Sequence, residues 1–230
     1  MTTFALDTAT PDPALALVGP DGIIAEAWLG RTSGGGRRVL ESAHHLLAMA
    51  GISVDALDEV VVGVGPGGFT GIRIGIATAL GLGQALAIPV HGASTLEALA
   101  LGAAVARRSS DELVAPVIDA RRRQVFAAVY AVEGEGHLHE VVAPASWDPD
   151  NLARALEGHA PMVMAGDGAD LVSPCTGCRR AAPGPLDRVR AADLVARVRA
   201  GGPLPVAPQY LRLPDAEENR LRREREAAAT

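Results

Sequence analysis

The sequence contains no lysine, so all 21 of its basic residues are arginine. Without lysine the chain cannot form a Schiff base, use a lysine general base or carry the lysine of a phosphate-binding P-loop. Aromatic residues make up only 3% of the chain, which leaves little material for a platform on which nucleic-acid bases stack. The formal net charge of −6 also argues against a protein whose main task is to neutralise long nucleic acids.

Long apolar runs and a leader sequence are lacking as well. No window of about 18 consecutive apolar residues predicts a membrane span. The first seven residues lack the charged and long apolar regions of a secretory signal peptide. We therefore expect a cytoplasmic protein without a membrane anchor. Hydrophobic residues make up 48% of the chain, which is enough for a sizeable core and excludes wholesale disorder.

Cysteine is limited to Cys175 and Cys178, in the motif Cys-Thr-Gly-Cys. A structural zinc ion normally needs four ligands, and no second Cys/His pair of suitable spacing accompanies them. We expect two loop thiols without an essential role, with a redox pair or a shared metal as the alternatives. His44 and His45 are adjacent, so on a helix they point about 100° apart and cannot share one metal ion. No metal site is predicted.

The apolar pattern of the first 106 residues predicts the order βββαβαβα. These elements span residues 3–6, 14–18, 23–29, 39–50, 60–64, 72–86, 87–90 and 94–106. Residues 34–36 are three glycines that should interrupt the chain before the first helix.

The second half repeats the opening of the first. Residues 114–118 and 125–132 predict a hairpin, and the pattern then predicts a helix over 147–156, a strand over 162–165 and a helix over 191–199. Residues 173–187 form a loop rich in proline and glycine, and a charged tail begins at 217. Asp7 and Asp119 hold matching places in the first turn of each half. We therefore predict two similar domains, residues 1–106 and 107–230.

Residues 65–71 form a glycine-rich loop between a predicted strand and a predicted helix. Such a loop can cradle a phosphate with unpaired N–H groups. A P-loop, however, needs Lys-Ser/Thr after the last glycine, where this chain has Ile72 and Arg73. The dinucleotide pattern is interrupted by Pro66, and its first glycine lies inside the strand. The loop fits neither standard form.

The helix after this loop is rich in small residues on two sides. Gly71, Gly75, Ala79 and Gly83 follow one i+4 ridge, and Ala77, Gly81 and Ala85 follow a second on a roughly opposite side. Interior glycines cost a helix about 1 kcal/mol each relative to alanine. Close packing against neighbouring elements must therefore offset the lower stability of the helix. One ridge can press on the chain's own sheet, which leaves the other to meet a further helix.

Five motifs occur in the order found in a known bacterial family. They are FALDTAT at 4–10, VGPGGFTGIRIG at 64–75, GASTLEALA at 92–100, VIDARR at 117–122 and PQYLR at 208–212. Together they resemble the TsaB (YeaZ) family, partner proteins in the threonylcarbamoyladenosine modification of tRNA. Three features depart from the family pattern: Gly68 stands where serine is usual, Gln124 stands where glutamate is usual, and the usual lead into the first helix is replaced.

The resemblance implies an α/β fold of two actin-like, ribonuclease H-like domains, each a mixed sheet flanked by helices. It also implies a non-catalytic subunit that works with the related catalytic protein TsaD and the ATPase TsaE. That complex transfers a threonylcarbamoyl group to N6 of adenosine 37 in tRNAs that read codons beginning with A. The chain would meet tRNA only through the complex and have no intrinsic cofactor, with nucleotide held at the interface inside the complex. Similar surfaces could form a homodimer.

The resemblance assigns partner contacts to the first two helices. On the first helix these are Val39, Leu40, Ala43, Leu46 and Leu47, and on the second Arg73, Ile74, Ala77, Thr78 and Gly81. The family motif loop comprises Gly65, Pro66, Gly67, Phe69, Thr70 and Gly71. No catalytic residue is predicted.

The nucleotide-binding turns of the fold are predicted to be vestigial. They are Asp7, Thr8 and Thr10 in the first hairpin, Asp119 and Arg121 in the second, and Gly166, Asp167 and Gly168 in the adenosine loop. The second turn carries bulky arginines where a nucleotide hairpin needs glycine for close backbone approach. The alternative hypothesis is a stand-alone small-molecule kinase or ATPase of this fold, in which arginines alone would stabilise the phosphate charge.

Overall fold

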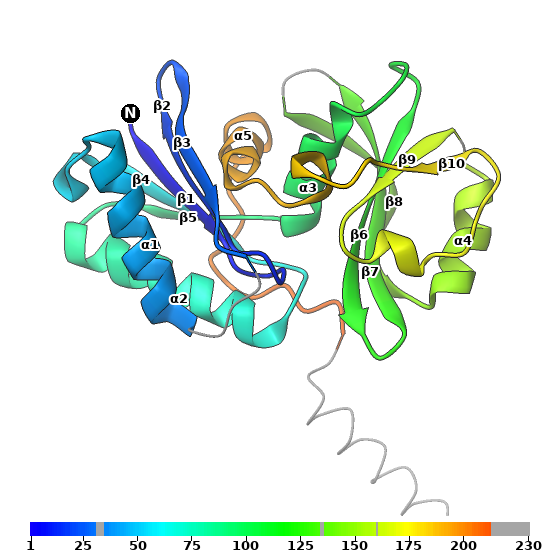
Figure 1. Ribbon diagram of the computed structural model, residues 1–230, viewed down its shortest axis with the longest axis horizontal. Coiled ribbons are helices and arrows are strands. Elements are labelled where there is room, and N and C mark those ends of the chain that lie inside the picture. The colour runs from blue at the N-terminus through cyan, green and yellow to red at the C-terminus, as the bar shows by residue number, and fades with distance from the viewer. Residues whose placement is uncertain (31–34, 134–135, 160, 213–230) are drawn as a thin grey trace, which may run out of the picture.

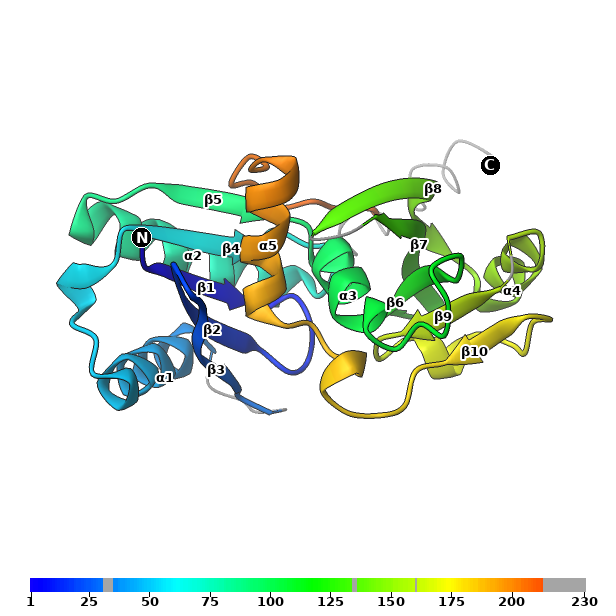
Figure 2. The ribbon, with the colours of Figure 1, turned by 90° about the horizontal axis from the view of Figure 1, so that it is seen from above.

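Two five-stranded mixed sheets stand side by side with two helices between them (Figure 1). The computed structural model describes residues 1–30, 35–133, 136–159 and 161–212. Seen from above, the two central helices separate the sheets into two lobes (Figure 2). The predicted charged tail from 217 onward, and Gly34 of the glycine run, lie outside the described residues. Helix α1 (Gly35–Ala50) includes the other two glycines of that run, so the predicted interruption does not extend over them.

The first sheet has the strand order β3-β2-β1-β4-β5. Its strands are β1 (Thr3–Asp7), β2 (Ala14–Gly19), β3 (Gly22–Trp28), β4 (Glu59–Gly63) and β5 (Val90–Ala93). Every residue of β1, β2 and β4 is buried, as their unbroken apolar runs predict for strands covered on both faces. Helix α1 and helix α2 (Phe69–Leu86) cover one face, and the short η1 turn (Val54–Ala56) joins α1 to β4.

Helix α2 is long and apolar enough, by length and composition, to cross a membrane. In this fold it lies along the first sheet instead. Its inner side, which includes Ile72, Gly75 and Ile76, is buried against the strands.

The second sheet repeats the topology of the first, with the order β10-β9-β6-β7-β8. Its strands are β6 (Leu113–Arg121), β7 (Gln124–Glu133), β8 (His137–Trp147), β9 (Met162–Ala165) and β10 (Cys178–Arg180). Strand β6 pairs antiparallel with β7 and parallel with β9, as β1 does with β2 and β4. Helix α4 (Pro149–Glu157) packs on this sheet, but the place of α2 is taken by the short η2 turn (Ala169–Leu171). The second lobe is thus a reduced copy of the first.

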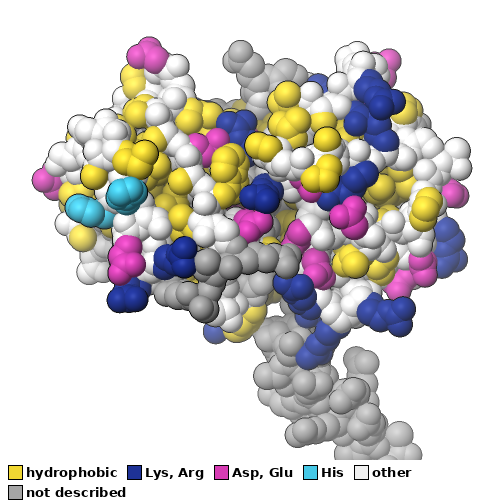
Figure 3. Space-filling model, in the orientation of Figure 1, with side chains coloured by type: hydrophobic (Ala, Val, Ile, Leu, Met, Phe, Trp, Pro, Cys, Tyr) yellow, Lys and Arg dark blue, Asp and Glu magenta, His cyan; other side chains and the backbone are white. Residues whose placement is uncertain are grey.

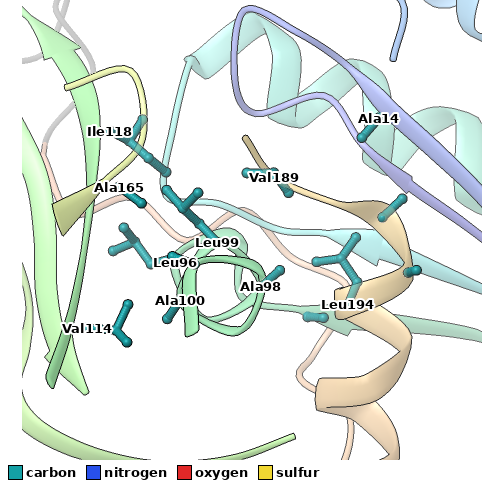
Figure 4. Packing of buried hydrophobic residues seen from close by; sticks show 14 of the residues in the cluster. Ala14, Leu96, Ala98, Leu99, Ala100, Val114, Ile118, Ala165, Val189 and Leu194 are labelled. Atoms are coloured by element: carbon teal, nitrogen blue, oxygen red, sulfur yellow. The ribbon is translucent and has the colours of Figure 1, made fainter. Parts of the chain in front are cut away.

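The two central helices each pack on the sheet of the opposite half of the chain. Helix α3 (Thr95–Ala104) contacts β6, β7 and β9, whereas α5 (Ala191–Gly201) contacts β1, β2, β4 and β5. A single apolar cluster therefore runs from Ala14 through Leu99 and Leu194 to Ile118 (Figure 4). A cut after residue 106 would separate α3 from the sheet that it covers. The domain limits drawn from the sequence stay a prediction.

Element order in the first half is confirmed as βββαβαβα, but some bounds were wrong. The predicted strand over 87–90 begins only at Val90, because Ala87 takes a left-handed conformation that ends α2. The predicted helix over 147–156 begins at Pro149, since Trp147 ends β8 and the side chain of Asp148 caps the helix. The alternation of His137, Leu138 and His139 indicates only the first three residues of strand β8, because burial along the whole strand alternates only weakly.

The two cysteines are joined in a disulfide, so the expectation of two loop thiols was wrong. The N–H of Cys178 donates to the carbonyl of Cys175, and this tight turn brings the two sulfur atoms together. Cys175 packs in the apolar cluster of the second lobe, and Cys178 begins the edge strand β10. The bond closes the loop between the η2 turn and the sheet.

The junction of α5 with β3 holds a buried carboxyl whose ionisation should make folding pH-dependent. Burial raises the pKa of Asp193 to about 7, and the nearby Glu26 carboxylate adds to this rise, whereas Arg190 opposes it. The folded chain therefore keeps a proton that the unfolded chain, with an ordinary pKa of 3.8, loses. Stability contributed by this proton is present at low pH and is lost as the pH rises from about 4 to about 7.

We expect Asp193→Asn to remove this component of the pH dependence. Urea unfolding of both proteins between pH 5 and 8 measures it. The wild type should lose stability relative to the variant as the pH rises, with most of the change below about pH 7. A constant difference across this range would mean that Asp193 ionises normally in the folded chain.

Candidate functional site

A cleft of about 590 Å³ opens where the two lobes meet. Four segments line it: the turn after β1, the glycine-rich loop before α2, the end of β6 and a C-terminal strap, which we define as residues 209–212. In nucleotide-binding proteins of related topology, ligands bind beyond the carboxyl ends of the parallel strands. The first and second predicted nucleotide turns meet at this place, whereas Gly166 and Asp167 of the predicted adenosine loop line a separate small pocket of about 30 Å³.

Asp7, the predicted acid of the first turn, does not line the cleft. Its side chain is fully buried. One oxygen accepts a hydrogen bond from the Ala9 N–H at 2.8 Å, and the other accepts one from Thr95 Oγ1 at 2.7 Å. Burial raises the pKa of this carboxyl above its usual range, against the lowering effect of these hydrogen bonds. The carboxylate braces the end of β1 from inside and faces no solvent.

Gly63 makes room for this arrangement. A Cβ atom at Gly63 would lie 1.9 Å from Asp7 Oδ2. Thr95 completes the brace, because its hydroxyl oxygen also accepts a hydrogen bond from the Gly65 N–H at 3.2 Å. Sequence analysis assigned Thr95 no contact with Asp7, so this partner of Asp7 was missed.

The glycines of the motif loop serve packing against the first turn. Cβ atoms at Gly67 and Gly71 would lie 2.4 Å from the Ala9 carbonyl oxygen and 2.0 Å from the Thr8 carbonyl oxygen. The Gly68 N–H donates to the Ala9 carbonyl at 2.7 Å, and Thr8 Oγ1 donates to the Gly71 carbonyl at 2.7 Å. Loop and turn are thus joined backbone to backbone. A phosphate cannot lie between them as it would in an open cradle.

The remaining members of the predicted loop and first turn lie at or under the same cleft. Phe69, Thr70 and Thr10 line it, whereas Gly65 and Pro66 are buried beneath, joined by a cis peptide bond.

The second turn brings Asp119, Arg121 and Asp167 together. Asp119 Oδ1 accepts from the Arg121 N–H at 2.7 Å, and Oδ2 pairs with Arg121 Nη1 at 2.8 Å. The Asp119 N–H donates to Asp167 Oδ1 at 3.0 Å. Gly166 and Gly168 press on β6: their Cβ atoms would lie 2.2 Å from the Val117 carbonyl oxygen and 2.7 Å from the Asp119 nitrogen. Here too the predicted nucleotide residues bond with one another.

The C-terminal strap is the part of the site for which the sequence suggested no role. The Gln209 N–H donates to the Val64 carbonyl at 2.8 Å, which fixes the strap beside β4. Tyr210 stacks on Phe69 with ring centroids 5.1 Å apart, and Arg73 donates from Nε to the Tyr210 hydroxyl at 2.9 Å. Arg212 Nη1 donates to Gln124 Oε1 at 3.0 Å. The strap therefore joins the base of α2 to the second sheet.

Most of the predicted partner contacts on α1 are buried within the folded chain. Val39, Ala43, Leu46 and Leu47 are buried against the first sheet and α2, and only Leu40 is exposed. The apolar periodicity identified the side of the helix that packs inward, as it does for any amphipathic helix. His44 is exposed near Leu40, on the edge of α1 toward η1 and α2, whereas Met49 is exposed on the edge toward β3. Figure 3 shows hydrophobic and histidine side chains on this flank of the first lobe.

The residues predicted on α2 lie on its outer side. Arg73, Ala77 and Gly81 are exposed, and Ile74 and Thr78 are partly exposed beside Gly36 of α1. The other small ridge faces inward: Cβ atoms at Gly75 and Gly83 would lie 2.4 Å from Thr8 Oγ1 and 2.3 Å from Val90 Cγ2. A Cβ atom at Gly81 would meet no atom within 4 Å.

Among the residues that the structure describes, no group of three or more His, Cys, Asp or Glu side chains is placed to hold a metal ion.

The fold and site define a two-lobed α/β protein of the actin-like, ribonuclease H-like class, in which residues of the predicted nucleotide turns form hydrogen bonds with one another and with the glycine-rich loop. The family profile described as "TsaD: tRNA N6-adenosine threonylcarbamoyltransferase" matches residues 36–174. Within this group the chain belongs to the TsaB (YeaZ) family.

Three relatives illustrate the match. The chain is 33% identical over 157 residues to the tRNA threonylcarbamoyladenosine biosynthesis protein TsaB of Escherichia coli, covering 68% of this chain and 67% of that protein. It is 35% identical over 222 residues to an uncharacterized protein of Mycobacterium tuberculosis, covering 94% of each. The solved structure of YeaZ from Pseudomonas aeruginosa has a TM-score of 0.75 at 28% identity, covering 91% of this chain and 99% of that one.

Proposed function

We propose that this chain is a non-catalytic subunit of a tRNA threonylcarbamoyltransferase complex in the cytoplasm. In this proposal it binds TsaD through the outer sides of α1 and α2, TsaE joins the pair, and tRNA is met only within the complex. Nucleotide would bind at the interface between the subunits and not at the predicted nucleotide turns of this chain. The support is the family membership together with the state of the cleft.

The observation that carries the proposal is the close packing of the turn after β1 against the glycine-rich loop. A catalytic member of this fold needs an acid that faces the cleft and glycines that admit phosphate. Here the Asp7 carboxylate is buried under Gly63, and Gly67 and Gly71 lie against the backbone of Thr8 and Ala9. These residues stabilise the lobe, which favours a structural role over that of a stand-alone kinase or ATPase.

The outer surface of the first lobe supports the partner contact. The exposed ridge of Ala77 and Gly81 would let a second helix approach closely. Beside it, Leu40, Val54 and Leu82 help to line a cavity of about 140 Å³ between α1, η1 and α2. An opening of this size and apolar lining suits an aliphatic or aromatic side chain of a partner.

The proposal is tested by threonylcarbamoyl transfer to tRNA with purified cognate TsaD and TsaE. We expect transfer only when all three proteins are present. Omitting this chain, TsaD or TsaE should each abolish it. Full activity without the chain would contradict the proposal, as would transfer in the absence of TsaD.

A further inference from the structure

Arginines and aromatic rings gather at the cleft and directly beside it. We call the residues Phe69, Arg73, Arg121 to Arg123, Tyr210 and Arg212 the arginine–aromatic rim. They come from three distant parts of the sequence: the start of α2, the turn between β6 and β7, and the strap. Figure 3 shows several basic side chains along the lower edge of the molecule.

Side-chain contacts connect Arg73, Phe69 and Tyr210, and the strap links them to the arginine turn. The Arg73 guanidinium lies 3.7 Å from the centroid of the Phe69 ring, and Phe69 stacks on Tyr210. Two residues further on, Arg212 bonds to Gln124, which pairs across the hairpin with Arg121. The cations and rings therefore hold fixed places relative to one another.

The arginine turn has an unusual backbone. Arg121, Arg122 and Arg123 all have positive φ angles, of 63°, 54° and 60°. Left-handed residues other than glycine cost free energy, on the order of 1 kcal/mol or more each, and such strain gathers at functional sites. Asparagine or glycine would relieve it at no loss of packing, since all three side chains are exposed. The turn presents three guanidinium groups in spite of this cost.

The charge and the rings of the rim match one kind of ligand. Asp119 is the only carboxylate among the residues that line the cleft, and Arg121 already pairs with it. Phe69 and Tyr210, 38% and 39% exposed, are the large aromatic side chains that the described chain leaves most open to solvent. Guanidinium groups bind phosphates in a forked geometry, and exposed rings stack on unpaired bases.

We propose that the arginine–aromatic rim binds a single-stranded segment of RNA, with phosphates on the arginine turn and an unstacked base against Tyr210. The inference rests on the proposed function, in which the RNA is the tRNA brought to the complex. The net charge of −6 makes binding by the chain alone weak, and the partner supplies the remaining contacts.

The test uses a labelled RNA hairpin with a single-stranded loop, titrated by fluorescence anisotropy against the chain alone at low salt and against its complex with TsaD. Arg122→Ala/Arg123→Ala removes two rim charges, and Arg154→Ala/Arg199→Ala is the matched control, since both of its residues are exposed and lie outside the rim. We expect the rim variant to bind the RNA about tenfold more weakly than the wild type does. The plot of log K against log salt concentration should also become shallower by about 1.4, because each phosphate contact with a single strand contributes about 0.7 to the magnitude of the slope. The control should keep the wild-type slope.

Tyr210→Leu separates RNA from a simple polyanion. It should weaken the loop RNA about tenfold and leave binding of a fully paired RNA duplex unchanged. Equal losses for the rim variant and the control, or wild-type binding by the rim variant, would overturn the proposal. If the chain does not bind TsaD but the rim variant still binds RNA more weakly than the wild type does, the proposed function is wrong and the assignment of the rim stands.

Discussion

Gly71→Ala should destabilise the chain by about 3 kcal/mol, although it replaces a helical glycine by the best helix former. The added Cβ atom would lie 2.0 Å from the Thr8 carbonyl oxygen, which belongs to the backbone and cannot rotate away. Thr8 is itself tied to the same glycine through its hydroxyl group. Relief would require the whole turn after β1 to move from α2, which would break the contact between loop and turn.

Gly81→Ala on the same helix is the matched control. Its Cβ atom meets nothing within 4 Å, so the substitution should stabilise the chain by about 1 kcal/mol. Guanidinium unfolding of the two variants measures both free energies. If Gly71→Ala also stabilised the chain, the glycine-rich loop would not be packed on the first turn, and an open phosphate cradle would again be tenable.

The second prediction concerns the outer ridge of α2. Ala77→Trp and Gly81→Trp should each weaken association with TsaD at least about a hundredfold, which corresponds to about 2.7 kcal/mol. Both positions are exposed, so the folded chain accommodates the ring, but a helix that approaches a small-residue ridge closely does not. Titration of labelled TsaD with each variant gives the dissociation constants.

Glu157→Trp, on an exposed position of α4 in the second lobe, provides the control. It should bind TsaD as the wild type does, and thermal unfolding should show all three variants folded. Wild-type affinity of both α2 variants would mean that TsaD, if it binds, uses another surface. Gly75 is unsuited to this test because its Cβ position is filled by Thr8, so a substitution there would report on folding.

Local sequence patterns were sufficient for most of the fold. The runs that became β1, β2 and β4 were long, apolar and bounded by turn residues, and the paired turns at Asp7 and Asp119 correctly indicated a repeated topology. The two ridges of α2 also followed from spacing alone. What patterns could not show is that α3 and α5 each cover the sheet of the other half. Helix α5, at residues 191–201, packs on strands at residues 3–19, and no local pattern links such distant segments.

The site was predicted less completely, for a related reason. An apolar stripe marks the side of a helix that is buried. The prediction for α1 therefore included the buried Val39 and Leu46 along with the exposed Leu40, and it omitted the exposed Met49. The strap was recognised only as a motif, since its contacts with Val64 and Gln124 are distant in sequence. Asp7 was found, but its partner Thr95 could not be, because one hydroxyl group eighty-eight residues away carries no pattern.

The most direct test of the account is the mass of the chain mixed with its cognate TsaD, measured by size-exclusion chromatography with light scattering. The account predicts one species with the summed mass of one chain and one TsaD, lost with Ala77→Trp and kept with Glu157→Trp. Two separate species at every micromolar concentration would contradict the central claim that this chain is an assembly subunit for TsaD.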